Sequence, residues 1–168
     1  MSDPGIIDVM LLPGDYAVGG PRHRIRTLLG SCVSITLWHP GARIGAMSHY
    51  LLAQNATPGH ELNARYGDDA LALMLAELGL SGVHGRDCQA KVFGGGQMFP
   101  ALGRRETVGQ KNGEAARRLL KKHGIALVSE SLFGAGHRQI VFDVGTGDVW
   151  SRQVDPGAPP PILKLERA

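Results

Sequence analysis

The chain has 168 residues, of which 43% are hydrophobic and 20% are charged, as expected for one soluble domain with a core of its own. Because a chain of this length can bury a core without staples, no cofactor is expected to be needed for folding. Its two cysteines, Cys32 and Cys88, are too few for a disulfide scaffold or a Cys-rich zinc site, which favours a reducing compartment. Without a leader-like N-terminus, a long apolar run or interleaved basic and aromatic residues, the sequence predicts a cytoplasmic protein that neither inserts into membranes nor binds nucleic acid.

Short runs with alternating apolar residues predict a chain rich in β-strands. In chain order, these strands are expected at residues 6–12, 16–18, 23–29, 33–38, 44–51, 88–93, 125–128, 139–144 and 148–154. Apolar residues at helical spacing interrupt them twice, at residues 68–79, with Asp68 or Asp69 as the cap, and at residues 109–123. Because helices do not alternate regularly with strands, the sequence predicts an α+β fold.

The connecting segments carry further signals. Residues 54–63 form a polar connection after a strand that ends in a histidine, and they are expected at the rim of a site. Glycines 94–96 lack the Gly-Lys-Ser/Thr of a phosphate-binding loop and indicate instead a backbone that closely approaches either a packed strand or a substrate side chain, with the packed strand favoured. The second helix carries cations that suit either a solvated face or an acidic partner: Arg117, Arg118, Lys121 and Lys122. Residues 1–155 are interpreted as a single domain and residues 156–168 as a proline-rich, extended tail.

A predicted hairpin brings a cysteine and a histidine together. Pro40 and Gly41 separate the strands at 33–38 and 44–51, so opposite residues should lie equally far from the midpoint between positions 40 and 41. Cys32 and His49 meet that condition. Directly opposite residues hold their Cβ atoms roughly 4.5–5.5 Å apart on one face, which is the separation that a thiol and an imidazole need.

Such a pair has two interpretations. The imidazole of His49 can take the proton of the Cys32 thiol and leave a nucleophilic thiolate with a lowered pKa, and backbone N–H groups around Gly30, Ser31 and Cys32 could then line an oxyanion hole. Alternatively, Cys32 is a small buried apolar residue and His49 is a satisfied core histidine. Cys88, which precedes an apolar strand, is expected to be protected.

Several motifs occur in the same order and at similar spacing in a known family. They are Leu-Gly-Ser-Cys-Val at 29–33, Gly-Ala-Met-Ser-His at 45–49, and the segments 65–68, 91–99, 109–112 and 134–138. In these motifs, over residues 7–154, the chain resembles the CheD chemoreceptor glutamine deamidases. The resemblance implies mixed β-sheets packed as a sandwich with outer helices, the architecture of the cytotoxic necrotizing factor toxins.

The resemblance also implies a reaction. It is the hydrolysis of glutamine side chains on methyl-accepting chemotaxis receptors to glutamate and ammonia, with Cys32 as nucleophile, His49 as proton carrier and no cofactor. The family orients its histidine with a threonine six residues before the cysteine. That position is Arg26 here, and Thr27 follows it, so in an uninterrupted strand Thr27 would face the other side. Thr27 is the predicted orienting residue if a small bulge turns it inward; otherwise another group orients His49.

Two other functions remain open at the level of the sequence. CheD proteins in some lineages bind a CheC-type phosphatase and stimulate it, so this chain could be a regulatory partner. It could also be a cysteine hydrolase for a small amide, a receptor methyl ester or another protein. For a receptor substrate, we expect a shallow groove rimmed by residues 54–63 and 94–96, with nearby Lys or Arg side chains that attract acidic helices.

Overall fold

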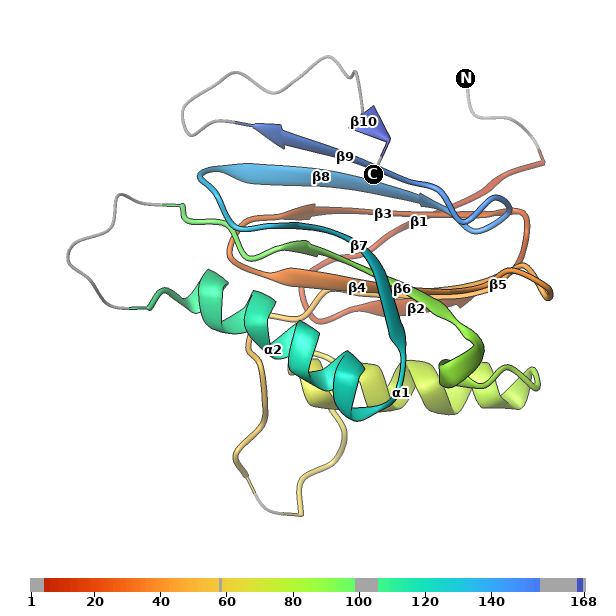
Figure 1. Ribbon diagram of the computed structural model, residues 1–168, viewed down its shortest axis with the longest axis horizontal. Coiled ribbons are helices and arrows are strands. Elements are labelled where there is room, and N and C mark those ends of the chain that lie inside the picture. The colour runs from red at the N-terminus through yellow and green to blue at the C-terminus, as the bar shows by residue number, and fades with distance from the viewer. Residues whose placement is uncertain (1–4, 58, 99–105, 155–165, 168) are drawn as a thin grey trace.

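Two β-sheets stack face to face in this computed structural model, which describes residues 5–57, 59–98, 106–154 and 166–167 (Figure 1). The first sheet contains, in spatial order, β1 (Ile7–Met10), β3 (His23–Leu29), β8 (His137–Asp143), β9 (Val149–Val154) and β10 (Glu166–Arg167). The second sheet contains β2 (Tyr16–Gly19), β5 (Ile44–Ser48), β4 (Val33–His39), β6 (Gln89–Gly94) and β7 (Ala126–Leu132). The predicted α+β sandwich is confirmed.

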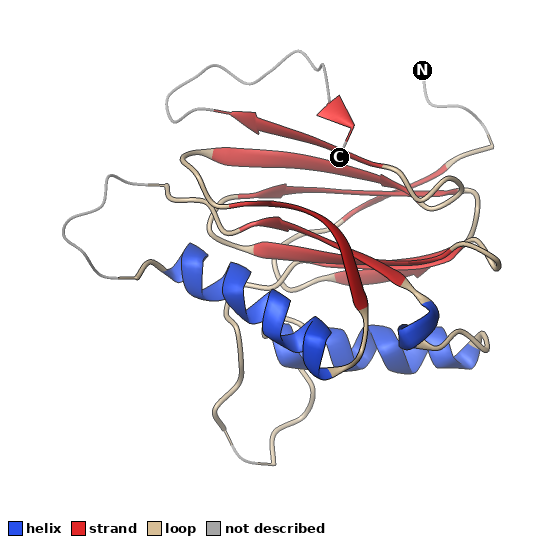
Figure 2. Ribbon diagram, in the orientation of Figure 1, coloured by secondary structure: helices blue, strands red, loops and turns tan. Residues whose placement is uncertain are grey.

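Helices cover one side of this sandwich. Helix α1 (Gly67–Leu80) and helix α2 (Val108–Lys122) both lie against the outer face of the second sheet, and a short 3-10 turn, η1 (Gly85–Asp87), precedes β6 (Figure 2). In the described part of the chain, no helix covers the outer face of the first sheet. None of the described helices has the length and apolarity to cross a membrane.

Strand β4 is buried on both faces because it lies in the middle layer. Val33, Ile35 and Leu37 pack toward the helices, in a core that includes Tyr50 of the next segment. The alternate residues of β4 face the first sheet, where a second core forms. This inter-sheet core consists of Leu11, Ile25, Leu29, Met47, Phe93, Ile140, Phe142, Val144 and Val149. The period-two alternation in the sequence therefore separates two apolar environments, not core from solvent.

All nine strands predicted from the sequence are present, but two of their pairings are parallel. β1 pairs with β3 and β6 pairs with β7 in parallel, so each sheet is mixed. β7 also runs four residues past its predicted end at Val128, through a polar segment. An edge strand has a neighbour on one side only, and its exposed positions tolerate polar side chains.

The start of α1 differs from the prediction. The helix begins at Gly67 with Tyr66 at the N-cap position and no side-chain cap, so Asp68 and Asp69 lie in its first turn. The carboxylate of Asp69 accepts instead from the Asn63 backbone N–H at 3.0 Å and contacts His60 Nε2 at 2.8 Å. The polar loop before the helix is anchored by this acid, while the first N–H groups of the helix donate to the carbonyls of Leu52 and Ala53 and to the Asp68 carboxylate.

The C-terminal tail is described only in part. Residues 156–165, on which the prediction of an extended proline-rich segment depends, lie outside the described residues. Glu166 and Arg167 form β10, which pairs antiparallel with β9 opposite Ser151 and Trp150. Glu166 and Arg167 therefore lie at the edge of the first sheet.

Candidate active site

Cys32 lies in the turn that joins the two sheets. β3 ends at Leu29 in the first sheet and β4 begins at Val33 in the second, so Gly30, Ser31 and Cys32 make the crossing between them. The Cys32 side chain is half-buried and packs against the inter-sheet core. Residues 30–32 are called the nucleophile turn below.

The register of the β4–β5 hairpin differs from the predicted one. Leu37 pairs with Ala46 and Val33 pairs with Tyr50, so the midpoint lies between positions 41 and 42. The reversal takes four residues, 40–43, because the backbone N–H of Arg43 donates to the His39 carbonyl at 2.8 Å and Arg43 adopts a positive φ of 52°. A tight turn centred on Pro40 and Gly41 was therefore the wrong assumption.

The corrected register still keeps Cys32 and His49 on one face. Cys32 immediately precedes the Val33–Tyr50 bridge and packs against the inter-sheet core, while His49 reaches Thr27 of the first sheet. Both side chains therefore point into the layer between the two sheets. Within the described residues the Cys32 thiol makes no hydrogen bond, as is common for catalytic pairs before substrate binds.

The imidazole of His49 is oriented by the first sheet. His49 is 2% exposed, and its Nδ1 lies 2.6 Å from the hydroxyl oxygen of Thr27 on β3. The same hydroxyl donates to the Leu11 carbonyl at 2.8 Å. Because a carbonyl only accepts, the single hydroxyl proton goes to Leu11, and Thr27 accepts from His49 Nδ1–H. This assigns the proton to Nδ1 and leaves the Nε2 lone pair as the base.

Thr27 reaches His49 without a bulge in β3. The strand pairs with β8 in unbroken register through Leu29, and Arg26 points outward, where its Nε lies 3.6 Å from the Asp8 carboxylate. A bulge at Thr27, or a different orienting group, would be needed only if one uninterrupted strand ran from Arg26 to Cys32. The nucleophile turn breaks that strand, so the alternation cannot be extended from Cys32 back to Thr27.

The resting site holds neutral groups. Burial lowers the pKa of His49 to about 4, although the nearby Asp15 carboxylate raises it in part, and burial raises the pKa of the Cys32 thiol. Burial of both groups therefore favours a neutral thiol and a neutral imidazole over the expected thiolate–imidazolium pair. A neutral thiol beside a neutral imidazole requires that His49 take the proton as the sulfur attacks.

We expect alkylation of native Cys32 by iodoacetamide to show its inflection above pH ~8.5, the ordinary thiol value, because burial disfavours the thiolate. The measurement is the alkylation rate against pH, followed by peptide mass spectrometry. Cys88 is buried and its pKa is raised to about 11, so it should remain unmodified over the same range. An inflection below pH 7 would restore the ion-pair interpretation.

The nucleophile turn is held through its carbonyl groups. The Gly30 carbonyl accepts from the Gly96 N–H and the Cys32 carbonyl accepts from the Gly95 N–H, each at 2.9 Å. Among the described residues, the N–H groups of Ser31 and Cys32 have no acceptor. Two adjacent N–H groups beside a thiol are what an oxyanion hole requires.

The glycine segment 94–96 packs beneath this turn and forms no rim. All three glycines are buried, and a Cβ on Gly94 would lie 2.2 Å from the Cys32 carbonyl oxygen. The buried guanidinium of Arg138 holds the segment from behind, donating to the carbonyls of Gly94 at 2.7 Å and Phe133 at 2.6 Å. Close packing of this backbone was predicted correctly, whereas its place at the rim of a groove was not.

Comparison with known proteins identifies the same family that the sequence motifs resemble. Residues 51–153 match the family model described as CheD chemotactic sensory transduction. A protein of Albidiferax ferrireducens, named probable chemoreceptor glutamine deamidase CheD 2, is 60% identical over 154 residues, 89% of each chain. This chain belongs to the CheD family. Similar relatives named as probable chemoreceptor glutamine deamidases include CheD 1 of Chromobacterium violaceum (45% identical, 90% of this chain and 80% of that one) and CheD of Pyrococcus horikoshii (44%, 86% and 91%).

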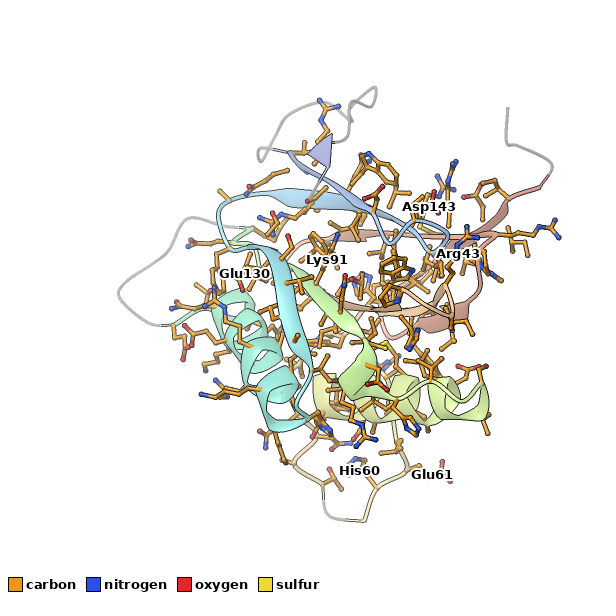
Figure 3. The ribbon with its side chains drawn as sticks, turned by 45° about the vertical axis from the view of Figure 1, so that its right-hand side comes forward. Arg43, His60, Glu61, Lys91, Glu130 and Asp143 are labelled. Atoms are coloured by element: carbon orange, nitrogen blue, oxygen red, sulfur yellow. The ribbon has the colours of Figure 1, made fainter. Side chains whose placement is uncertain are left out.

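The loop between β5 and α1 of this CheD chain borders two surface cavities. One has a volume of about 430 Å³ and is lined by Asp15, Glu61 and Leu62, among others. It lies beside Gly14 and Asp15, whose backbone groups bond to the backbone of His49. The other, of about 450 Å³, lies against α2 and includes Gln54, Arg118 and Lys122. Figure 3 shows Glu61 and His60 on this loop beyond α1, at the far side of the molecule from Asp143 and the first sheet. The cations Arg118 and Lys122 thus border the cavity against α2.

Two contacts of the candidate site in this CheD protein were not predicted from its sequence. The Leu11 carbonyl sets the histidine tautomer, and a main-chain group has no sequence signature. The Asn112 side chain contacts the nucleophile turn, although residues 109–112 were noted only as a family motif. Asn112 has one sequence signal that could have revealed it, a polar residue on the inward stripe of an amphipathic helix.

Proposed function

We propose that this CheD protein is a glutamine deamidase of chemoreceptors that uses Cys32 as nucleophile and His49 as proton carrier. The observation that carries the proposal is the chain of contacts from the Leu11 carbonyl through Thr27 to His49 Nδ1, which leaves Nε2 as a base on the face that Cys32 shares. The names of the relatives supply the substrate class.

In the proposed reaction, the Cys32 sulfur forms a bond to the amide carbon while its proton passes to His49 Nε2. The oxyanion accepts from the N–H groups of Ser31 and Cys32, and each such donor typically contributes about 10²–10³ in rate. His49 then protonates the amide nitrogen as the C–N bond breaks and ammonia leaves. Water, deprotonated by His49, adds to the thioester, and the C–S bond breaks to release glutamate and restore the thiol.

The charge distribution suits an acidic partner on one side of the site. The cavity against α2 is lined by two cations, Arg118 and Lys122, and one carboxylate, Asp68, and it adjoins the loop that follows His49. The chain has a net charge of +3. Receptor adaptation helices in the resembling family are acidic, so these cations would attract them over distances limited by salt screening. The carboxylates of Asp15 and Glu61 border the opposite cavity and would favour one orientation of the bound helix.

The proposal is tested with a cytoplasmic chemoreceptor fragment from the same organism. Wild type should convert specific glutamines, read by mass spectrometry as a gain of ~1 Da each, and Cys32→Ala should convert none. Cys88→Ala is the matched control and should match wild type, because Cys88 lies away from the site in the helix-side core. Absence of conversion by wild type with every receptor, together with tight binding to a CheC-type phosphatase, would favour the regulatory role instead.

Thr27→Val should lower kcat about 10–100-fold, the usual effect of losing a group that orients a catalytic ligand or base. Valine keeps the shape but leaves His49 Nδ1–H and the Leu11 carbonyl without their shared partner, so the imidazole can adopt the wrong tautomer. Thr27→Ser retains the hydroxyl and should stay within about threefold of wild type. Equal turnover of the valine and serine variants would remove Thr27 from the mechanism.

A further inference from the structure

Asn112 is a buried polar residue in the middle of an otherwise amphipathic helix. It is 1% exposed, on the face of α2 that packs against the second sheet. Asparagine forms helices less readily than alanine, so local propensity does not explain the choice. Its side chain must be satisfied by partners outside the helix.

The amide group of Asn112 connects the two halves of the active site. Its Nδ2 donates to the Ser31 carbonyl at 3.1 Å and to the Leu51 carbonyl at 2.7 Å. Both partners only accept, so the NH₂ group and not the oxygen must face them. Ser31 belongs to the nucleophile turn, and Leu51 follows His49 by two residues.

The contact with Ser31 controls the direction of one N–H group. The Ser31 carbonyl and the Cys32 N–H belong to the same peptide unit, and the described chain contains no cis peptide bond. In a trans peptide the C=O and N–H point in opposite directions. When Asn112 holds the Ser31 oxygen, the Cys32 N–H therefore points away from α2, with no acceptor among the described residues.

A second bond fixes the helix that carries Asn112. The Tyr50 hydroxyl, fully buried, donates to the Asn112 main-chain carbonyl at 2.6 Å. This bond ties α2 to the segment beside His49 but does not touch the peptide between Ser31 and Cys32. Tyr50 therefore offers a way to weaken the helix attachment while leaving that peptide in place.

We propose that Asn112 is a positioning residue that aims the Cys32 N–H into the oxyanion hole and holds the nucleophile turn against the His49 segment. The proposal deepens the deamidase function and rests on it, but it applies to any acyl transfer to Cys32. It predicts that loss of Asn112 impairs reactions that pass through an oxyanion and spares those that do not.

Two probes of Cys32 separate these cases without a receptor. p-Nitrophenyl acetate acylates the thiol through a tetrahedral oxyanion: the S–C bond forms, p-nitrophenolate leaves, and the thiol proton passes to His49. Iodoacetamide alkylates the same sulfur by direct displacement of iodide, with no oxyanion. The ratio of the two rates therefore reports the oxyanion hole, after subtraction of the rates measured with Cys32→Ala.

We expect Asn112→Ala to lower the acylation-to-alkylation ratio at least tenfold while the alkylation rate changes less than threefold. Asn112→Ser can donate to one carbonyl at most and should give an intermediate ratio. It replaces Asn112→Ala as the test variant if the alanine variant does not fold. Lys111→Ala, an exposed neighbour on α2, and Tyr50→Phe should keep the wild-type ratio, even if Tyr50→Phe lowers the melting temperature.

The outcomes are distinct. A wild-type ratio in Asn112→Ala, or an equal loss of both rates, would overturn the positioning role and leave Asn112 as a structural residue. If wild type converts no receptor glutamine but its ratio still depends on Asn112, the deamidase proposal fails and the positioning role stands. On receptor glutamines, the positioning role predicts a tenfold or greater loss in kcat with KM within about threefold.

Discussion

Replacing His49 by alanine is expected to lower kcat for receptor glutamines by about 10³-fold, within the range that general acid–base groups contribute. The reason is that burial disfavours spontaneous ionisation of the Cys32 thiol, and the Nε2 of His49 is the acceptor left free by the contact with Thr27. Deamidation is measured by mass spectrometry of a receptor fragment. His84→Ala, an exposed histidine near η1, is the matched control and should retain full activity.

The pH dependence gives a second readout for His49. Activity of wild type should fall as the pH drops through about 4, because the imidazolium cannot accept the thiol proton. Stability should decline earlier, as the pH falls below about 6.5, because the unfolded chain takes up a proton there that folded His49 binds only near pH 4. In His49→Ala, the free energy of unfolding measured in urea should no longer show this decline between pH 6.5 and 4. An acid limb of activity near pH 6.5 would contradict the neutral-pair mechanism.

Gly94→Ala is expected to destabilise the fold by about 3 kcal/mol or more and to abolish activity in whatever protein remains folded. Gly94 has a φ of 110°, which residues with a side chain rarely adopt, and its added Cβ would lie 2.2 Å from the Cys32 carbonyl oxygen. The clashing atom belongs to the backbone of the nucleophile turn, and the Val33 Cα of β4 lies 3.2 Å from the added Cβ, so the backbone itself must move. Urea unfolding measures the stability loss.

A second glycine separates the effect of the steric clash from the effect of backbone strain. Gly82 also has a positive φ, of 75°, but a Cβ there would meet no atom within 4 Å. Gly82→Ala should therefore show only the strain of its backbone conformation, about 1 kcal/mol, and keep full activity. Similar losses in the two variants would mean that the close approach of Gly94 to Cys32 carries no weight.

The sequence alone determined the elements and a candidate reactive pair. Alternating apolar positions located all nine strands, and a free cysteine followed by a histidine in the next strand identified the candidate pair. These inferences depend only on the spacing of residues within short segments, which can be read directly from the sequence. The family motifs added the sandwich and the reaction, which local spacing cannot predict.

Tertiary structure alone decided how those residues work together. The register of Cys32 and His49 depends on a four-residue loop whose geometry is set by a bond from Arg43 to His39, and the inward direction of Thr27 depends on a turn that crosses between sheets. The tautomer of His49 and the direction of the Cys32 N–H depend on a main-chain carbonyl from residue 11 and an amide from residue 112. Such contacts join positions far apart in the chain. Burial of the site then shifts the pKa values of Cys32 and His49. Because burial is a property of the folded protein, neither spacing nor composition could have predicted these shifts.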